Sequence, residues 1–368
     1  MDVALVDHHC HAVAGGPLER PTLESYLSES QRPPPEGCSA FDSALGVAVR
    51  RWCAPALGLP TGAEPDAYTA ARLELGAEEA NRRLMRAAGL DALLIDTGLA
   101  GEELVEPDEL GRLAGAEVRE VVRLETVAEE VAAARKTAGA FADAFAAELD
   151  ARAAAGAVAV KSIVAYRHGL DFDAGPPSAA EVRRAAGGWL AAGGGRLTDP
   201  VLLRHLIWRG IATGLPLQLH TGFGDPDEDL HRCDPALLTG FLRATADAGP
   251  PILLLHTYPY HRQAAYLANV FPHVHMDVGL AITHVGLRAP ALLAEALELA
   301  PFGKLLFSSD AYGLAELYLA AAAAFRAALD EVLPALGISD AERERVAAMI
   351  GSGNAQRVYR LGTAAEGG

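Results

Sequence analysis

A cluster of imidazoles follows the first apolar run of this chain. Val3–Val6 has the composition of a buried strand, and His8, His9, Cys10 and His11 come within the next five residues. Side chains of an extended segment alternate between two faces, so His9 and His11 should point to one side, and His8 and Cys10 to the other. Imidazole nitrogens are common zinc ligands, so this strand end offers a metal two of them. A solvated histidine-rich turn is the alternative, and the spacing alone leaves both open.

Polar residues also follow later apolar runs. A single histidine beside a buried strand more often packs in the core than binds a metal. Six polar groups after five such strands are harder to explain by packing, and they favour a shared site. Five other histidines lack this placement and are assigned no chemistry: His205, His231, His273, His275 and His284. The residues that complete the candidate set with His9 and His11 are Lys161, His220, His256 and Asp310.

Eight β-rich runs alternate with segments of helical periodicity, which predicts parallel strands joined by crossover helices. Eight such units close a (β/α)8 TIM barrel, whose active sites lie at the carboxyl ends of its strands. The predicted strands are Val3–Val6, Ala92–Ile95, Val118–Leu124, Ala157–Val160, Pro216–Leu219, Ile252–Leu255, Val274–Met276 and Lys304–Phe307. The predicted helices include Ala67–Ala88, Thr126–Ala154, Asp199–Thr213, Asp234–Ala248, Arg262–Val270 and Pro290–Leu299.

The 368 residues exceed a minimal barrel, and we expect residues 1–368 to form one domain with additions. Residues 17–65 form an insertion after the first strand; it begins as a proline-rich loop and continues in a helical stretch, Phe41–Trp52. We expect this insertion to act as a lid. Residues 314–368 are expected to add C-terminal helices.

Composition narrows the class of partner. The formal net charge of −17 argues against a nucleic-acid partner or an anionic membrane surface. No apolar run reaches the length of a membrane span, and no secretory leader is recognisable, so a cytoplasmic location is expected. The four cysteines show no paired spacing and are expected to be reduced and mostly buried. We expect a small-molecule substrate and a homodimer.

Several short segments resemble a known family. The order of candidate residues, with His-x-His after the first strand, Lys after the fourth, His after the fifth and sixth, and Asp after the eighth, is similar to that of the amidohydrolase superfamily. The local sequences resemble its amidohydrolase-2 branch, especially the subgroup related to the barrel domain that is fused to glutamine-synthetase-like domains. These segments are Val160–Arg167, Leu219–Gly222, His256–Arg262, Ser308–Ala311 and Gly353–Tyr359.

This resemblance implies a divalent metal, zinc first, with manganese or iron as alternatives. One ion would be held by His9, His11, His220 and Asp310, and Asp310 would also take a proton from the attacking water and return it to the leaving group. His256 would either ligate a second ion or polarise the substrate carbonyl. A carbamylated Lys161 would bridge two ions. The alternative leaves Lys161 as an ammonium that binds a substrate carboxylate or reaches the rim.

Substrate contacts are expected beyond the metal. Arg167 is a candidate carboxylate clamp beside Tyr166, although pairing with an acidic neighbour is the commoner fate of an arginine. Tyr258 and His261 are candidates to support an oxyanion, with Arg262 beside them. A helix-capping His261 and a solvent-exposed Arg262 are the alternatives.

These features together predict a metal-dependent hydrolase that cleaves the amide C–N bond of a small carboxylated substrate, with γ-glutamyl amides as the first class to consider. The amidohydrolase-2 resemblance also leaves open a mononuclear, non-oxidative decarboxylase of an aromatic or related acid. The third alternative is a non-catalytic barrel that binds a glutamine-synthetase-like partner. The six reactive side chains argue against it, because a binding protein has no need of them.

Overall fold

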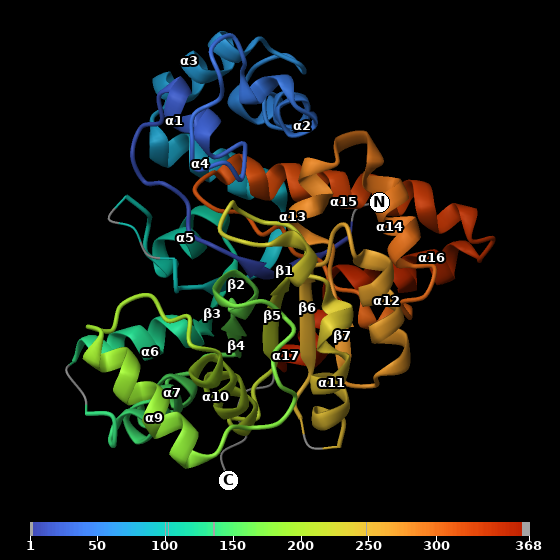
Figure 1. Cartoon of the computed structure of the whole chain (residues 1–368). Coiled ribbons are helices and arrows are strands. Elements are labelled where there is room, and N and C mark those ends of the chain that lie inside the picture. Colours follow the sequence, from blue (N-terminus) through green and yellow to red (C-terminus); the bar gives the residue numbers. More distant parts are fainter. Residues whose placement is uncertain (1–2, 100, 102, 135–136, 248, 363–368) are drawn as a thin grey trace.

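Seven parallel strands form one sheet, in the order in which they follow along the chain (Figure 1). The computed structural model describes residues 3–99, 101, 103–134, 137–247 and 249–362. The strands of this described part are β1 (Leu5–Cys10), β2 (Leu90–Asp96), β3 (Glu117–Arg123), β4 (Ala159–Ser162), β5 (Leu217–Thr221), β6 (Ile252–His256) and β7 (Val274–Met276). Their sequential order and the helices between them confirm the predicted α/β barrel class.

The eighth predicted strand is an extended segment without a regular ladder. Lys304 ends a 3₁₀ turn, η6 (Phe302–Lys304), so the extended backbone begins one residue later than predicted. The Leu306 amide donates to the Met276 carbonyl (3.0 Å), and on the other side the His8 amide donates to the Phe307 carbonyl (3.2 Å). This segment therefore lies between β7 and β1 and hydrogen-bonds to both.

Helices cover the outside of the sheet. Two predicted helices are divided: the first breaks at Gly76, whose φ of +78° ends one helix and begins the next, and the second becomes α6 and α7, with residues 135–136 outside the described part. The predicted helix 234–248 is a 3₁₀ turn and α11, and residue 248 is not described. The helices between the strands are α3 (Pro65–Leu75), α4 (Ala77–Ala88), α5 (Pro107–Ala114), α6 (Leu124–Ala133), α7 (Phe141–Ala154), α8 (Val164–Arg167), α9 (Ala179–Ala191), α10 (Pro200–Ala212), η3 (Leu230–Arg232), η4 (Pro235–Leu238), α11 (Thr239–Thr245), α12 (His261–Val270), α13 (Gly279–His284), η5 (Gly286–Arg288) and α14 (Ala289–Ala296).

The segment after β1 and the C-terminal segment add further helices. The first contains α1 (Arg20–Ser25), η1 (Ala40–Asp42), α2 (Ala44–Trp52) and η2 (Pro55–Leu57), which gather with α3 at one end of the molecule in Figure 1. The second contains α15 (Ala315–Ala335), α16 (Asp340–Ala348), the π-helical turn η7 (Met349–Gly353) and α17 (Asn354–Tyr359). None of the helices in the described ranges has the length and apolarity that a membrane span requires.

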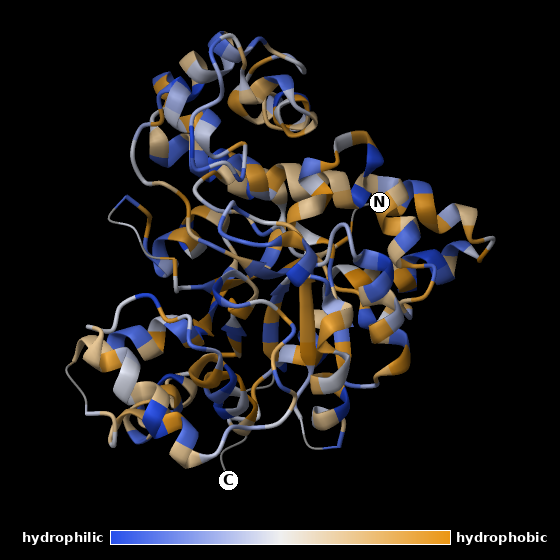
Figure 2. Ribbon diagram, in the orientation of Figure 1, coloured by the Kyte–Doolittle hydropathy of each residue, from blue (hydrophilic) through white to orange (hydrophobic). Residues whose placement is uncertain are grey.

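The interior of the barrel is a separate apolar cluster, closed at one end by α17. It is formed by alternating residues of the strands, and Figure 2 shows the hydrophobic character of β6 within it. Ala355, Val358 and Tyr359 of α17 pack against these side chains, and α17 lies beside the residues that precede β4, β5 and β6. The amino ends of these strands are therefore covered, whereas polar residues occupy their carboxyl ends. The strand residues of this cluster, with one from the closing segment, are Val6, Ala92, Leu94, Val121, Ala159, Leu253, Leu255 and Leu306.

Candidate metal centre

Four of the six candidate residues lie within the last residues of strands, whereas His11 follows β1 and Asp310 follows the extended closing segment. β1 continues to Cys10, so it contains His9, and β4, β5 and β6 likewise contain Lys161, His220 and His256. The predicted strands ended too early because polar residues were taken as the end of each strand. At the carboxyl end of a barrel strand a buried polar residue can remain within the ladder when it faces a site.

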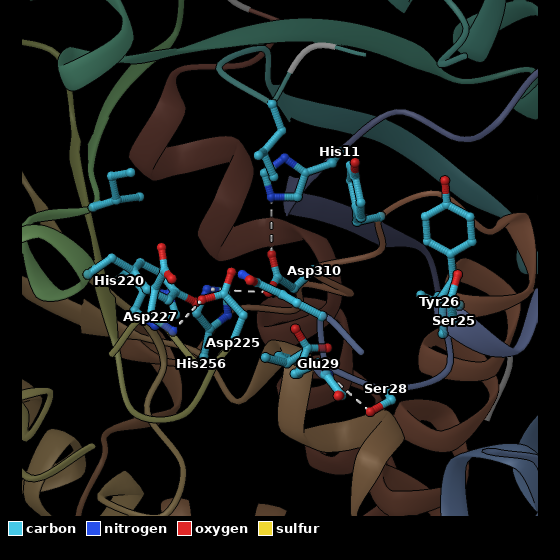
Figure 3. A pocket seen from close by; sticks show the side chains of 18 of the residues that line it. His11, Ser25, Tyr26, Ser28, Glu29, His220, Asp225, Asp227, His256 and Asp310 are labelled. Atoms are coloured by element: carbon cyan, nitrogen blue, oxygen red, sulfur yellow. Dashed lines mark hydrogen bonds and ion pairs between the residues drawn. The ribbon is translucent and has the colours of Figure 1, made fainter. Parts of the chain in front are cut away.

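Three imidazoles converge on the carboxylate of Asp310. Its Oδ1 lies 3.1 Å from Nε2 of His9 and 3.4 Å from Nε2 of His11, and its Oδ2 lies 3.5 Å from Nε2 of His256. Figure 3 shows His11 and His256 on either side of Asp310. One ligand atom each from His9, His256 and Asp310 lies within 4.8 Å of the other two. His9 and His11 therefore face the same centre, as their spacing predicts.

The protonation states of these residues suit a cation. Burial lowers the pKa of the His256 imidazole well below its ordinary value, and burial and the nearby Lys161 lower that of His9 to about 3. Burial alone would raise the pKa of Asp310, but the surrounding imidazoles, first that of His256, hold it well below its ordinary value. Both ring nitrogens of His256 are buried without a hydrogen-bond partner among the described residues. Neutral imidazoles around an ionised carboxylate are the donor set of a divalent transition metal, so the residues fit one.

The backbone is strained where it presents these groups. His256, Thr257 and Asp310 have φ angles of 67°, 57° and 52°, in the left-handed region that non-glycine residues rarely adopt. The side chain of Asp277 accepts a hydrogen bond from the His256 amide (2.7 Å), and its carbonyl accepts one from the Thr257 hydroxyl (2.8 Å). Asp277, which directly follows β7, thus holds the end of β6 in place.

Lys161 lies among ligand atoms. Its Nζ is 2.8 Å from Nε2 of His9 and 3.2 Å from Oδ2 of Asp96, which also receives two hydrogen bonds from Arg123. Burial and Arg123 lower the pKa of Lys161, although Asp96 acts in the opposite direction. Asp96 also forms a second candidate ligand group with His9 and His11. Sequence reasoning missed Asp96, although a carboxylate directly after the run Ala92–Ile95 is the same signal that selected the other residues.

His220 lies in the same cavity but faces another residue. Its ring centroid is 4.8 Å from that of His256 and 4.2 Å from that of Tyr166. Its Nε2 is 3.1 Å from Oε2 of Glu228, a carboxylate that also accepts a hydrogen bond from the Gly224 amide (2.8 Å). His220 belongs to neither candidate ligand group. Glu228 lies in the loop after β5, where no periodic pattern predicts the position of a side chain.

A buried hydrogen-bond chain orients His9 from behind. Its Nδ1 lies 2.9 Å from Oε1 of Gln218, and the amide nitrogen of Gln218 donates to the Tyr359 hydroxyl (2.8 Å). The same hydroxyl is 2.9 Å from Nδ1 of His8, whose Nε2 is 2.9 Å from Asp277. A register irregularity in β1 accompanies this arrangement. His9 and His11 share a side as predicted, but His8 reaches the same hydrogen-bond chain as His9, although alternation predicted that these two side chains face opposite sides. Oε1 of Gln218 accepts the hydrogen bond from Nδ1 of His9, and this contact directs Nε2 of the same ring toward Asp310.

A cavity of about 810 Å³ opens above this centre. Tyr166 and Arg167 line it, as does His284, a histidine to which the sequence assigned no role. Residues 25–26 and 28–34 of the predicted insertion also line it, and Figure 3 shows Ser28 and Glu29 beside Asp310. The insertion therefore contributes to the cavity wall, and its action as a lid stays a prediction.

The other predicted substrate residues lie elsewhere. Tyr258 and His261 line a separate pocket of about 500 Å³. Nε2 of His261 is 2.8 Å from Glu295 of α14, and Arg262 pairs with Glu298 (2.9 Å) at the exposed surface. Helix α12 begins at His261 and packs against α14, so it carries these side chains away from the metal centre.

The fold and this cluster define a class: a barrel enzyme with a divalent-metal centre at the carboxyl ends of its strands. An amidohydrolase family model, that of the amidohydrolase-2 branch, matches residues 6–361, so the chain belongs to the amidohydrolase family. The resemblance seen in the sequence is thus confirmed.

Known structures and proteins agree with this assignment. A Lactobacillus casei protein, provisionally described as a metal-dependent hydrolase, is 31% identical and matches with a TM-score of 0.88 over 98% of this chain and 96% of its own. Glucuronate isomerase from Caulobacter crescentus shares the fold at 15% identity, with a TM-score of 0.67 over 99% of this chain and 93% of its own. The protein FluG of Emericella nidulans is 33% identical over 200 residues, which are 50% of this chain. That match spans only 23% of the length of FluG.

Proposed function

We propose that this protein is a metal-dependent hydrolase that cleaves the amide C–N bond of a small carboxylated substrate, with γ-glutamyl amides as the class to test first. The observation that carries the proposal is the ionised carboxylate of Asp310, surrounded by three buried imidazoles at the base of a cavity. The sequence resemblance to barrels that are fused to glutamine-synthetase-like domains supports the γ-glutamyl class.

The chain's own residues supply proton transfer and orientation. A bound divalent ion would activate a water molecule and polarise the amide carbonyl. Asp310 would accept a proton from the attacking water and return it to the departing nitrogen. Its depressed pKa keeps it ionised, which is the form that can take a proton. His9, His11, His256 and Asp310 would hold the ion. Gln218 fixes the ring of His9, so this donor is oriented before substrate arrives.

Arg167 is the proposed contact for the substrate carboxylate. Its side chain is 9% exposed and lines the cavity, and Nη1 lies 3.1 Å from Glu129. Its Nε is buried and has no hydrogen-bond partner within the described ranges. A buried guanidinium nitrogen without a partner is costly, so a carboxylate that binds there would be favoured.

The chemical state of Lys161 decides whether the site would hold one metal ion or two. Its depressed pKa favours the neutral amine, which is the form that adds to carbon dioxide to give a carbamate and a proton. We propose that Lys161, once carbamylated, would be a ligand shared by two ions, with zinc as the first metal to test. The ion pair with Asp96 favours the opposite state, an ammonium beside one ion, which suits the second candidate function, a mononuclear decarboxylase of aromatic acids.

The test is a reaction screen by NMR with protein loaded with zinc or manganese. The panel holds γ-glutamyl amides and aromatic carboxylic acids, and chelator-treated protein is the control. We expect metal-dependent release of amine from at least one γ-glutamyl amide. Release of carbon dioxide from an aromatic acid, with every amide intact, would replace the hydrolase by the decarboxylase.

A further inference from the structure

Charged side chains of both signs line the metal-centre cavity. The cations include Arg167 and Arg196. Burial lowers the pKa of Arg167, Glu129 raises it, and the charge of Arg196 lowers it further. Both arginines already have acidic partners, since Arg167 is 3.1 Å from Glu129 and Arg196 is 2.8 Å from Asp227. The charges of these two arginines are therefore partly neutralised.

The acidic group is not neutralised in this way. It contains Glu29 and Asp225, and Asp310 and Glu228 lie close enough to act on the charge of Glu29. Among the described residues, neither Glu29 nor Asp225 forms an ion pair with a lysine or an arginine. The cavity thus holds two carboxylates that no cation of the described chain balances.

Glu29 is placed to meet a ligand. It comes from the segment after α1, within the insertion, and Figure 3 shows it in the cavity with Asp225, on the other side of Asp310 from His11. Its side chain is 35% exposed, and its Oε1 lies 3.5 Å from Nε2 of His284. That nitrogen is buried without a hydrogen-bond partner in the described part of the chain.

A second, independent observation shows that this cavity is built for a ligand. The side chain of Arg167 is more than nine-tenths buried, and its Nε lacks a partner among the residues described, although it lines the same space. A substrate that satisfies Arg167 with a carboxylate adds one more negative charge to an acidic cavity. A positive group on the same substrate would offset that charge where Glu29 and Asp225 lie.

We propose that the substrate carries an ammonium group, and that Glu29, with Asp225, binds it. This inference rests on the proposed function and narrows its substrate class from carboxylated amides to amides of amino acids. It also gives the insertion a role, because the specificity-determining carboxylate is contributed by residues 17–65 and not by the barrel.

The test compares two probes that differ only in the ammonium group: γ-glutamyl-p-nitroanilide and glutaryl-p-nitroanilide. Calorimetric titration of the metal-loaded protein measures the binding of each. We expect the γ-glutamyl probe to bind at least about 10-fold more tightly, the ratio expected for one hydrogen bond to a charged group. Glu29→Gln should remove most of that preference and leave the affinity for the glutaryl probe within about 2-fold.

Glu103→Gln is the matched control, since it removes another carboxylate from the same cavity wall. It should keep the preference. Equal binding of the two probes, binding of neither, or a preference that survives Glu29→Gln would overturn the inference. Release of p-nitroaniline is scored separately: preferential binding without release would support ammonium recognition and contradict the hydrolase.

Discussion

The histidines at the two ends of the sheet show what makes a metal site. His256 at the end of β6 and His275 within β7 are both buried, and burial lowers the pKa of each, that of His275 to about 3. His256 faces a carboxylate and two further imidazoles, whereas the other charges acting on His275 are cationic, first that of Lys304. Burial and a neutral ring are therefore common to both ends. At the carboxyl ends of the strands the imidazoles converge on a carboxylate, that of Asp310, and this feature distinguishes the metal centre from the surroundings of His275.

Asp310→Asn should have the largest effect, because it removes the carboxylate that distinguishes the metal centre from the histidines at the other end of the sheet. The amide keeps the shape of the side chain but cannot accept the proton, so kcat for the best amide substrate should fall by at least about 1,000-fold. Steady-state kinetics on metal-loaded protein measures it. Asp227→Asn, which changes an exposed cavity carboxylate paired with Arg196, is the control and should lose less than about 5-fold. A comparable loss in both variants would remove Asp310 from its role.

Lys161→Ala tests the bridging role next. If a carbamate on Lys161 joins two ions, the variant should retain one ion per chain or fewer, because the shared anionic ligand is lost. Elemental analysis of reconstituted protein gives the stoichiometry. Lys304→Ala, a lysine beside the unused histidines, should keep the wild-type value. Equal metal content in wild type and Lys161→Ala would end the two-ion proposal.

Tyr359→Phe should have an intermediate effect, although Tyr359 lies on the C-terminal helix and contacts no ligand atom. Loss of its hydroxyl leaves Gln218 and His8 each without one hydrogen-bond partner, so His9 is held less firmly. We expect metal affinity to fall by about 10-fold, the lower limit for loss of a supporting contact. Competition with a chelator measures this. Tyr266→Phe, at an exposed tyrosine of α12, should change nothing, and equal affinities in all three proteins would show the hydrogen-bond chain to be structural only.

The smallest effect concerns His275 and pH. Its folded-state pKa of about 3 lies below the unfolded value of about 6.5, so the neutral ring stabilises the fold above pH 6.5, and that stability is lost as pH falls toward 3. At pH 4.5 the loss should be about 2.5 kcal/mol. Urea unfolding at pH 7 and 4.5 should show that His275→Gln is less acid-sensitive than wild type by this amount, with exposed His231→Gln as the control. An unchanged acid sensitivity would mean that other groups dominate.

Much of the framework was predictable because strand ends repeat one signal. Apolar runs followed by polar residues located His9, Lys161, His256 and Asp310 near their positions, since barrel geometry brings every strand end to the same place. The predicted boundaries were short by one to four residues because buried polar residues continue β1, β4, β5 and β6.

The remainder depends on contacts between distant segments. Glu228 and Glu29 come from loops whose paths no periodicity predicts, and their approach to the site is visible only in three dimensions. Tyr258 and His261 come shortly after β6, yet both line another pocket, and His261 is the first residue of α12. Position after a strand thus predicts which side chains reach the rim, but the direction of the next helix decides which enter the site.

The most direct test of the central claim is an anomalous-scattering map from crystals grown with zinc. We predict a peak bonded to His9, His11, His256 and Asp310, with a second peak beside Lys161 if the carbamate forms. A peak at His273 and His275 with none at Asp310, or no peak in protein saturated with zinc, would contradict the metal centre and with it the proposed hydrolase.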